Sequence, residues 1–259
     1  RAARPDGSAG RFAKPSEAVS RPLEEILAAG PAARITEVIA RLKGIVAALP
    51  PDDGLRAFTA LYLAVTEAVE EAAKPGGFED GRFVRWLDVA FANLYFEALR
   101  NALLGGGPVP KAWAPLIAAR RKGGVLPLQF ALAGMNAHIN RDLPLALVRT
   151  CEARRVDLKR RSPQQRDFRA INALLARVEA QVKAQLVTEA LRDFDVALGE
   201  LDDVIAMWKV ERAREAAWNH AEALWALREA PQLSARFLRT LDRMVGFAGR
   251  GLLRPIALR

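Results

Sequence analysis

The chain has 259 residues, of which 51% are hydrophobic, 7% are aromatic and 27% are charged. This length can bury one large core, so we expect a single domain, with two helical subdomains as the alternative. The longest apolar runs, such as residues 125–137, are too short to span a bilayer, which excludes a membrane span and favours a soluble protein.

The 39 Lys and Arg residues outnumber the 30 Asp and Glu residues, which gives a net charge of +9. Basic residues gather only in two short stretches, residues 120–122 and 154–161, and both coincide with expected loops. Elsewhere arginines alternate with acidic residues, as on solvated helix faces. A nucleic-acid site needs Lys and Arg clustered on one surface, so we expect no nucleic-acid partner.

The first residues and the single cysteine carry little chemistry. Residues 1–14 are rich in Gly, Pro and Arg without a hydrophobic period, which predicts a disordered arm before a helical domain over residues 15–259. No signal-peptide pattern is present, which favours a cytoplasmic protein. Cys151 is the only cysteine, so an intramolecular disulfide is excluded, and we expect it to pack as a small hydrophobic residue.

Apolar residues recur at helical spacing along the chain, and no alternating strand pattern appears. Ala and Leu, both good helix formers, supply most of the apolar residues. We therefore predict an all-α fold, an irregular bundle of eight or nine helices around a central buried helix. Capping and breaking residues place the helices at about 15–29, 35–49, 54–73, 81–104, 111–121, 126–152, 162–191, 201–228 and 232–246.

Two of these segments are predicted to lie inside the bundle. Residues 81–104 are apolar on more than half of the helix circumference, so this helix should be buried centrally. Residues 126–140 are nearly all apolar or amide, which also places them inside. Pro144 should end or kink this second helix, because proline removes a backbone donor.

The strongest chemical signal is a group of four polar residues within that buried helix: Asn136, His138, Asn140 and Asp142. Buried polar groups must be paired, so four in seven residues imply a polar network or a wet cavity. His138 and Asp142 lie one helical turn apart, where they can share a divalent cation such as zinc, or where Asp142 can orient His138 as a general base. The alternative is a hydrogen bond that pins the helix near Pro144.

The helix over residues 81–104 offers partners for this pair. Asp88 and Asn93 interrupt its aromatic stripe, and Asp88 is a tentative third metal ligand. Asn93 and Tyr95 are candidate substrate-binding residues. The alternative for both polar residues is ordinary exposure to solvent.

The helix over residues 201–228 begins with Asp202 and Asp203 and contains three further candidates. The paired aspartates resemble part of the magnesium motif of helical prenyl-diphosphate enzymes, but the motif's further aspartate is missing and an N-cap role explains them more simply. Trp208 and Trp218 are candidate ligand-binding residues. His220 is predicted either to meet His138 across the bundle or to lie on the surface.

Four segments together resemble a family of bacterial proteins, domain-of-unknown-function family 5995. They are residues 87–99, 126–147, 202–208 and 213–225, and the resemblance covers most of residues 30–255. It is most specific in AGMNAHINRDLP. The resemblance implies an actinobacterial type of helical protein and brings no settled activity with it.

Residues 137–143, followed by Pro144, also resemble the His-x-x-x-Asp-Leu segment of the zinc-dependent phospholipase C and single-strand nuclease fold. That resemblance implies that His138 and Asp142 are zinc ligands. The chain has only two histidines, too few for the three-zinc cluster of that fold. Two possibilities are then left: a single metal ion bound mainly by carboxylates, or a site of this type that has lost its metal.

The leading hypothesis is an enzyme, a hydrolase or lyase-like catalyst, with His138 as general base or metal ligand and Asp142 orienting it. Asp88, Asn93, Asn136 and Asn140 would support the substrate. The alternative is a carrier that encloses an apolar small molecule between aromatic residues. Its wall would be formed by Phe91, Tyr95, Trp208 and Trp218. A third alternative is a purely structural bundle.

Overall fold

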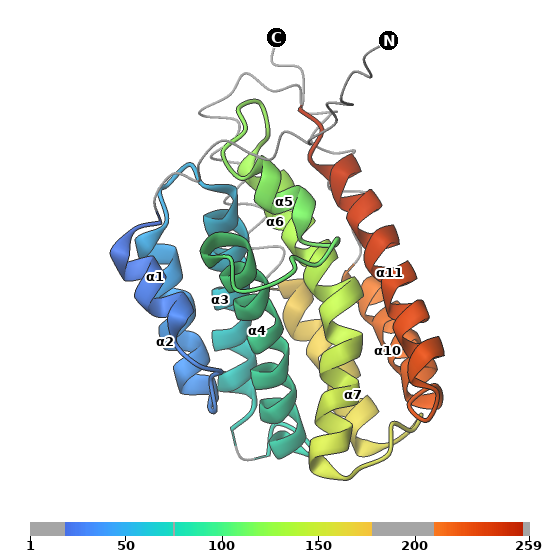
Figure 1. Ribbon diagram of the computed structural model, residues 1–259. Coiled ribbons are helices and arrows are strands. Elements are labelled where there is room, and N and C mark those ends of the chain that lie inside the picture. The colour runs from blue at the N-terminus through green and yellow to red at the C-terminus, as the bar shows by residue number, and fades with distance from the viewer. Residues whose placement is uncertain (1–18, 75, 178–209, 256–259) are drawn as a thin grey trace, which may run out of the picture.

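The computed structural model describes residues 19–74, 76–177 and 210–255, and every regular element within these ranges is helical (Figure 1). The predicted all-α fold is therefore confirmed. The predictions for residues 1–14, Asp202, Asp203 and Trp208 lie outside the described residues. The described helices are α1 (Arg21–Ala28), α2 (Ile35–Ala48), α3 (Gly54–Ala72), α4 (Gly81–Leu104), α5 (Ala114–Ala119), α6 (Pro127–Ala137), the π-helical turn η1 (His138–Asp142), α7 (Leu143–Arg154), α10 (Val210–Ala226) and α11 (Pro231–Leu252). Residues 163–177 are also helical.

Local capping signals placed several helix ends correctly. Asp53 precedes α3 and its side chain accepts a hydrogen bond from the backbone N–H of Leu55. Ser162 precedes the helical residues 163–177, and its Oγ accepts a bond from the N–H of Gln165 at 3.1 Å. Side chains of this kind satisfy backbone donors that the first turn of a helix leaves free. Helix α4 has the predicted bounds and ends at Gly105, whose φ of +71° is left-handed.

Helix α11 is longer than the sequence pattern predicted. The prediction ended it near Gly246, but the helix continues to Leu252. A Cβ on Gly246 would lie 2.3 Å from the carbonyl oxygen of Lys111. This glycine therefore allows close packing against a neighbouring backbone and does not end the helix.

Helix α6 is the central element of the fold. All ten of its residues from Leu128 to Ala137 are buried, and the helix packs against α3 on one side and α11 on the other (Figure 1). Helix α4 is less central than predicted, because Trp86 is 50% exposed and Glu97 faces solvent. The buried segment predicted around residues 126–140 is therefore the core of the bundle.

Two glycine–phenylalanine contacts bring α3 and α6 close together. A Cβ on Gly54 would lie 2.4 Å from the ring of Phe130, and a Cβ on Gly134 would lie 2.3 Å from the ring of Phe58. The contacts are one turn apart on each helix, so the two helices run parallel. Each phenylalanine ring occupies the space that a side chain on the opposite glycine would fill.

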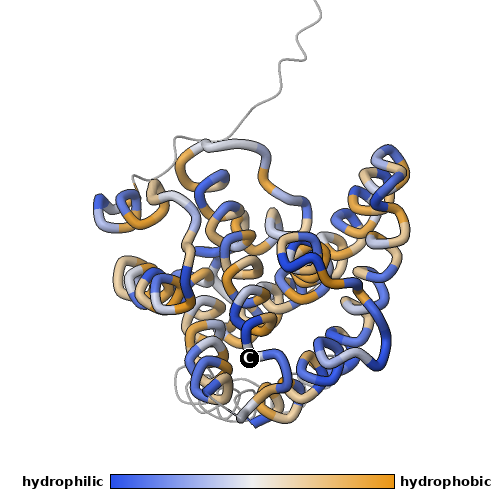
Figure 2. Tube along the Cα trace, turned by 90° about the horizontal axis from the view of Figure 1, so that it is seen from below, coloured by the Kyte–Doolittle hydropathy of each residue, from blue (hydrophilic) through white to orange (hydrophobic). Residues whose placement is uncertain are grey.

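Apart from α6, which is buried on all sides, the helices bury one face and expose the other. Seen from below, most of them alternate hydrophobic and hydrophilic residues along their turns, as amphipathic helices do (Figure 2). Within the described residues, no helix has the length and apolar character that crossing a bilayer would require.

Candidate active site

The helix that carries the predicted pair widens into a single π-helical turn. This turn, η1, spans His138–Asp142, and the N–H of Leu143 donates to the carbonyl of His138, five residues earlier. Pro144 follows in the first turn of α7 and cannot donate to the carbonyl four residues before it. Of the two outcomes predicted at Pro144, an end or a kink, the helix does not end there: it continues from η1 into α7. Turns of this kind are frequent at functional sites.

His138 and Asp142 form a buried hydrogen-bonded pair, here called the dyad. The side chains are 2% and 0% exposed, and His138 Nδ1 lies 3.1 Å from Asp142 Oδ2. The same Oδ2 accepts a hydrogen bond of 2.9 Å from Trp113 Nε1, and Oδ1 accepts one of 2.6 Å from Arg141 Nη1. Both oxygens of the Asp142 carboxylate are therefore engaged by donors.

Arg141 connects the dyad to the outer helices. Its Nη1 contacts Asp142, and its Nε lies 3.7 Å from Asp242 Oδ1 on α11. Asp242 in turn accepts hydrogen bonds from the backbone N–H groups of Lys111 and Ala112, at 2.9 and 3.0 Å. The position of the dyad is thus coupled to the packing of α11 and to the segment before α5.

The electrostatics of the dyad assign its protons. Burial by itself raises the pKa of Asp142, but the His138 hydrogen bond and the Arg141 charge outweigh it and hold that pKa below its usual value. The carboxylate is then ionised at neutral pH and can only accept hydrogen bonds, so Nδ1 of His138 carries a proton. Burial lowers the pKa of His138, although Asp142 opposes this effect. A neutral His138 protonated on Nδ1 has a free lone pair on Nε2.

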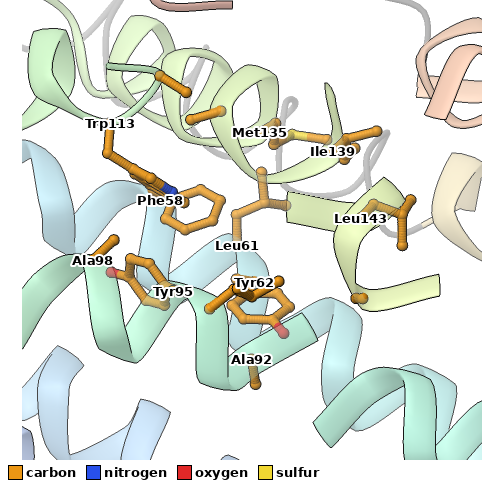
Figure 3. Close-up of a cluster of buried hydrophobic side chains, with 14 of the residues drawn as sticks. Phe58, Leu61, Tyr62, Ala92, Tyr95, Ala98, Trp113, Met135, Ile139 and Leu143 are labelled. Atoms are coloured by element: carbon orange, nitrogen blue, oxygen red, sulfur yellow. The ribbon is translucent and has the colours of Figure 1, made fainter. Parts of the chain in front are cut away.

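Aromatic rings surround His138. The Phe91 ring lies face to face with the imidazole, with centroids 3.5 Å apart and an interplanar angle of 6°. Tyr62 meets it edge-on at 4.6 Å, and Phe58 and Trp113 each lie 5.8 Å away. Figure 3 shows Phe58, Tyr62 and Trp113 gathered in the core between α3, α4 and α6. These rings keep the dyad out of bulk solvent, which strengthens its electrostatic interactions.

His138 also lines a cavity of about 60 Å³. Its Nε2 is buried and has no hydrogen-bond partner in the part of the chain that the structure describes. A cavity of this size holds a few water molecules, and therefore a small substrate or the reactive end of a longer one. The wall is largely apolar, and its members are Phe58, Leu61, Tyr62, Val65, Thr66, Val69, Leu87, Asp88, Phe91, Met135, His138, Ile139, Leu143, Ile171, Leu175 and Arg214.

Asp88 and Arg214 are the charged members of this wall. Burial raises the pKa of Asp88 to about 7, although Arg214 opposes the shift. Burial likewise lowers the pKa of Arg214 to about 10. Arg214 donates to the Phe168 carbonyl and to Asn172 Oδ1, each at 2.7 Å. Asp88 lies one turn before Phe91 on α4, so a partly protonated carboxyl stands close to the residue that stacks on His138.

The structure does not bring the predicted asparagines to the cavity. Asn140 donates to Asn136 Oδ1 at 3.1 Å, and Asn136 donates to the Val245 carbonyl on α11 at 3.0 Å. Asn93 makes two hydrogen bonds with the backbone of Ala32, at 2.8 and 2.9 Å. All three therefore connect elements of the fold, and the polar cluster divides into the dyad and an asparagine link to α11.

The other predicted ligand residues also lie away from the cavity wall. The Tyr95 hydroxyl pairs with Thr59 Oγ1 at 2.6 Å. Trp218 is buried against Phe168, with ring centroids 5.1 Å apart. His220 on α10 contacts the Phe237 ring, with centroids 5.9 Å apart. Of the aromatic residues proposed for a carrier, Phe91 lines the cavity.

The arrangement fits a metal ion poorly. Within the described ranges, no three His, Cys, Asp or Glu side chains gather in a way that could hold a metal. Both oxygens of Asp142 already accept hydrogen bonds from Trp113, His138 and Arg141. The geometry is that of an oriented imidazole, in which a carboxylate sets the tautomer. Asp88 lines the same cavity as His138, but the two do not belong to a cluster of three metal-binding side chains within the described residues.

Sequence reasoning missed two residues of the site. Trp113 bonds to Asp142 across 29 residues of sequence, and Arg214 reaches the cavity from α10. Trp113 follows a Gly- and Pro-rich loop, and Arg214 lies in an amphipathic helix whose other arginine, Arg212, is exposed. Neither position carries a local signal of burial.

The fold and the site together define a class: all-helical proteins with a buried imidazole–carboxylate dyad beside an apolar cavity. The chain belongs to a family of unknown function, DUF5995, whose model matches residues 35–255. This match covers every described helix from α2 to α11 and confirms the expected family. No curated protein and no solved structure shows a significant match to the chain.

Proposed function

We propose that the chain is an enzyme in which His138 acts as a general base on a small, largely apolar substrate. The observation that carries this proposal is the asymmetry of the imidazole. Nδ1 is hydrogen-bonded to Asp142. Nε2 is buried and has no hydrogen-bond partner among the described residues, and the His138 side chain lines the cavity. A base needs such a lone pair together with a group that holds its tautomer.

The chemistry follows from these two nitrogens. Nε2 takes a proton from a water molecule or from an acidic C–H bond of the substrate, and the imidazolium that forms is stabilised by the Asp142 carboxylate. Because burial lowers the pKa of His138, the base is neutral and active at pH 7. The first proton source corresponds to a hydrolase and the second to a lyase-like enzyme.

Asp88 and Arg214 would assist from the same cavity wall. A carboxyl with a pKa of about 7 is partly protonated at neutral pH, so it can donate a proton to a departing group. The Arg214 guanidinium can stabilise negative charge that develops on the substrate. A base and an acid in one cavity form the pair that proton-transfer enzymes need.

The first test is the protonation state of His138. The chain has only two histidines, so ¹⁵N NMR of the imidazoles, with His220→Gln for assignment, reports on each. We expect His138 to be neutral and protonated on Nδ1 at pH 7. A charged His138, or one protonated on Nε2, would contradict the proposal.

The second test is turnover. A series of p-nitrophenyl esters of increasing acyl length probes the hydrolase branch with small apolar substrates. Loss of a general base typically reduces the rate by about 10²–10⁴-fold, so we expect His138→Gln to lose that much and His220→Gln to keep the rate. The rate should rise as the pH increases through the lowered pKa of His138. It should stay level above pH 7, because p-nitrophenolate is a good leaving group and does not need a proton from Asp88. An ester activity that is equal in both variants would not belong to this site.

The apolar wall favours one alternative, a carrier that holds a ligand without reacting with it. In that case, native mass spectrometry of the purified protein would show a retained apolar molecule, and Phe91→Ala would release it. Binding would then persist in His138→Gln, which distinguishes a carrier from an enzyme.

A further inference from the structure

A second hollow lies apart from the His138 cavity, where the connection between α1 and α2 meets α4 and α7. Its volume is about 660 Å³, within the range of small-molecule sites, roughly 300–1,000 Å³. None of its lining residues lines the His138 cavity. This hollow, here called the Trp86 groove, is lined by Ala32, Ala33, Arg34, Ile35, Thr36, Arg85, Trp86, Val89, Ala90, Asn93, Arg149, Thr150 and Ala153.

One wall of the Trp86 groove is a partly uncovered aromatic ring. Trp86 on α4 is 50% exposed, in contrast to the buried Trp113 and Trp218. The guanidinium of Arg154 lies 5.8 Å from the Trp86 ring centroid, which is within the range of a cation–π contact. Large exposed aromatic surfaces are favourable places for a flat ligand to stack.

The groove is positively charged. Arg34 and Arg85 are paired with Glu37 and Glu70, but Arg149 has no acidic partner among the residues that the structure describes. The lining residues include three arginines and no Asp or Glu. A negatively charged ligand would therefore find an unneutralised cation at Arg149.

A buried hydroxyl at the same place has no hydrogen-bond partner among the described residues. Thr150 is 1% exposed, and its Oγ1 makes no hydrogen bond within the described part of the chain. Threonine in a helix usually donates to a carbonyl of the preceding turn, as Thr59 and Thr66 do here. Thr150 lies next to Arg149 and lines the groove, so a ligand held by Arg149 can satisfy it.

We propose that the Trp86 groove binds a small aromatic anion, a ligand class distinct from the apolar substrate of the His138 cavity. Its ring lies on Trp86, and its acidic group pairs with Arg149 and accepts a hydrogen bond from Thr150. The apolar side chains of Ile35, Val89 and Ala153 enclose the remainder of the ring system. The groove is thus a second site, independent of the proposed base.

The test uses two dyes that differ in charge. The probe is 8-anilinonaphthalene-1-sulfonate, an aromatic sulfonate whose fluorescence rises in an apolar site, and N-phenyl-1-naphthylamine is its neutral counterpart. We expect the folded wild-type chain to bind one sulfonate dye saturably. Trp86→Ala should weaken both dyes by about tenfold or more, because each loses its stacking surface.

Arg149→Gln separates charge from shape. This variant should weaken the sulfonate dye by about tenfold, since a charge-assisted contact is lost, and should change the neutral dye less than about twofold. Thr150→Val should weaken the sulfonate dye by about two- to tenfold. The matched control is Arg82→Gln, an exposed arginine on the same helix as Trp86 but outside the groove, which should leave both dyes unchanged.

Three results would overturn the proposal. One is the absence of saturable binding of the sulfonate dye. Another is equal weakening by Arg149→Gln and Arg82→Gln, which would indicate a general charge effect. The third is undiminished binding of both dyes to Trp86→Ala, provided that circular dichroism shows each variant folded. Dye that bound in the His138 cavity would give this third result, whether or not His138 acts as a base.

Discussion

The substitution Asp142→Asn tests the dyad, because it keeps the shape of the side chain and removes its charge. In the wild-type chain the carboxylate accepts hydrogen bonds from His138, Trp113 and Arg141. The amide of asparagine has one oxygen and one NH₂ group. Whichever way the amide is turned, its NH₂ group faces an N–H donor, either that of Arg141 or those of Trp113 and His138.

The expected cost follows from the burial of these groups. Breaking a buried charge pair by removing one partner costs about 3–5 kcal/mol. Arg141 is 15% exposed and retains Asp242 at 3.7 Å, so the lower end of this range applies, about 3 kcal/mol. For a chain of this size, that loss lowers the melting temperature by about 6–12 °C.

The pH dependence of stability gives a second signature. The folded-state pKa of His138 is lowered by burial, so as the pH falls through about 6.5 the unfolded chain binds the proton first and stability decreases. The decrease stops when His138 itself becomes protonated. Asp142→Asn removes the carboxylate that opposes the lowering of the His138 pKa. In this variant His138 is protonated only at a lower pH, so the loss of stability should extend over a wider range of acidic pH.

Urea unfolding at pH 7.5 and at lower pH measures both effects. The matched control is Asp157→Asn, since Asp157 is 58% exposed and paired with Lys159, and we expect it to leave the stability close to that of the wild-type chain. If Asp142→Asn stays within about 1 kcal/mol of the wild-type chain, the three hydrogen bonds do not hold the site as described.

Two further tests address the packing around the dyad and the charge in its cavity. Gly134→Ala places a methyl group against the Phe58 ring and should destabilise the fold by about 1–3 kcal/mol, whereas Gly251→Ala, with nothing within 4 Å, should stabilise it by about 0.5–1 kcal/mol. Equal thermal stabilities of these two variants would contradict the close contact of α3 and α6. Asp88 has a raised pKa of about 7, so its contribution to stability is full below about pH 4 and is lost as the pH rises to about 7. Asp88→Asn should therefore unfold at higher urea than the wild-type chain at pH 8, and an unchanged pH profile would show that the carboxyl is solvated.

Much of the fold follows from short-range signals in the sequence. The bounds of α2, α3 and α4 were predicted from hydrophobic periodicity together with capping and breaking residues. Residue type also indicated an N-cap at Asp52 or Asp53, of which the structure has Asp53, and one at Ser162. These signals act within one or two turns, so they survive without knowledge of the partner helices. The density of polar residues around His138 also indicated a site, because buried polar groups need partners.

The tertiary structure decided which partners those are. Periodicity does not show that Asp142 bonds to Trp113, that the asparagines of the same segment tie α6 to α11, or that Arg214 faces the cavity. It also treated Gly246 as a helix end, although that glycine allows two backbones to approach. The physical reason is that the register between helices depends on how side chains of distant segments fill shared space. A single segment specifies its own turns, whereas a site between helices exists only once they have packed.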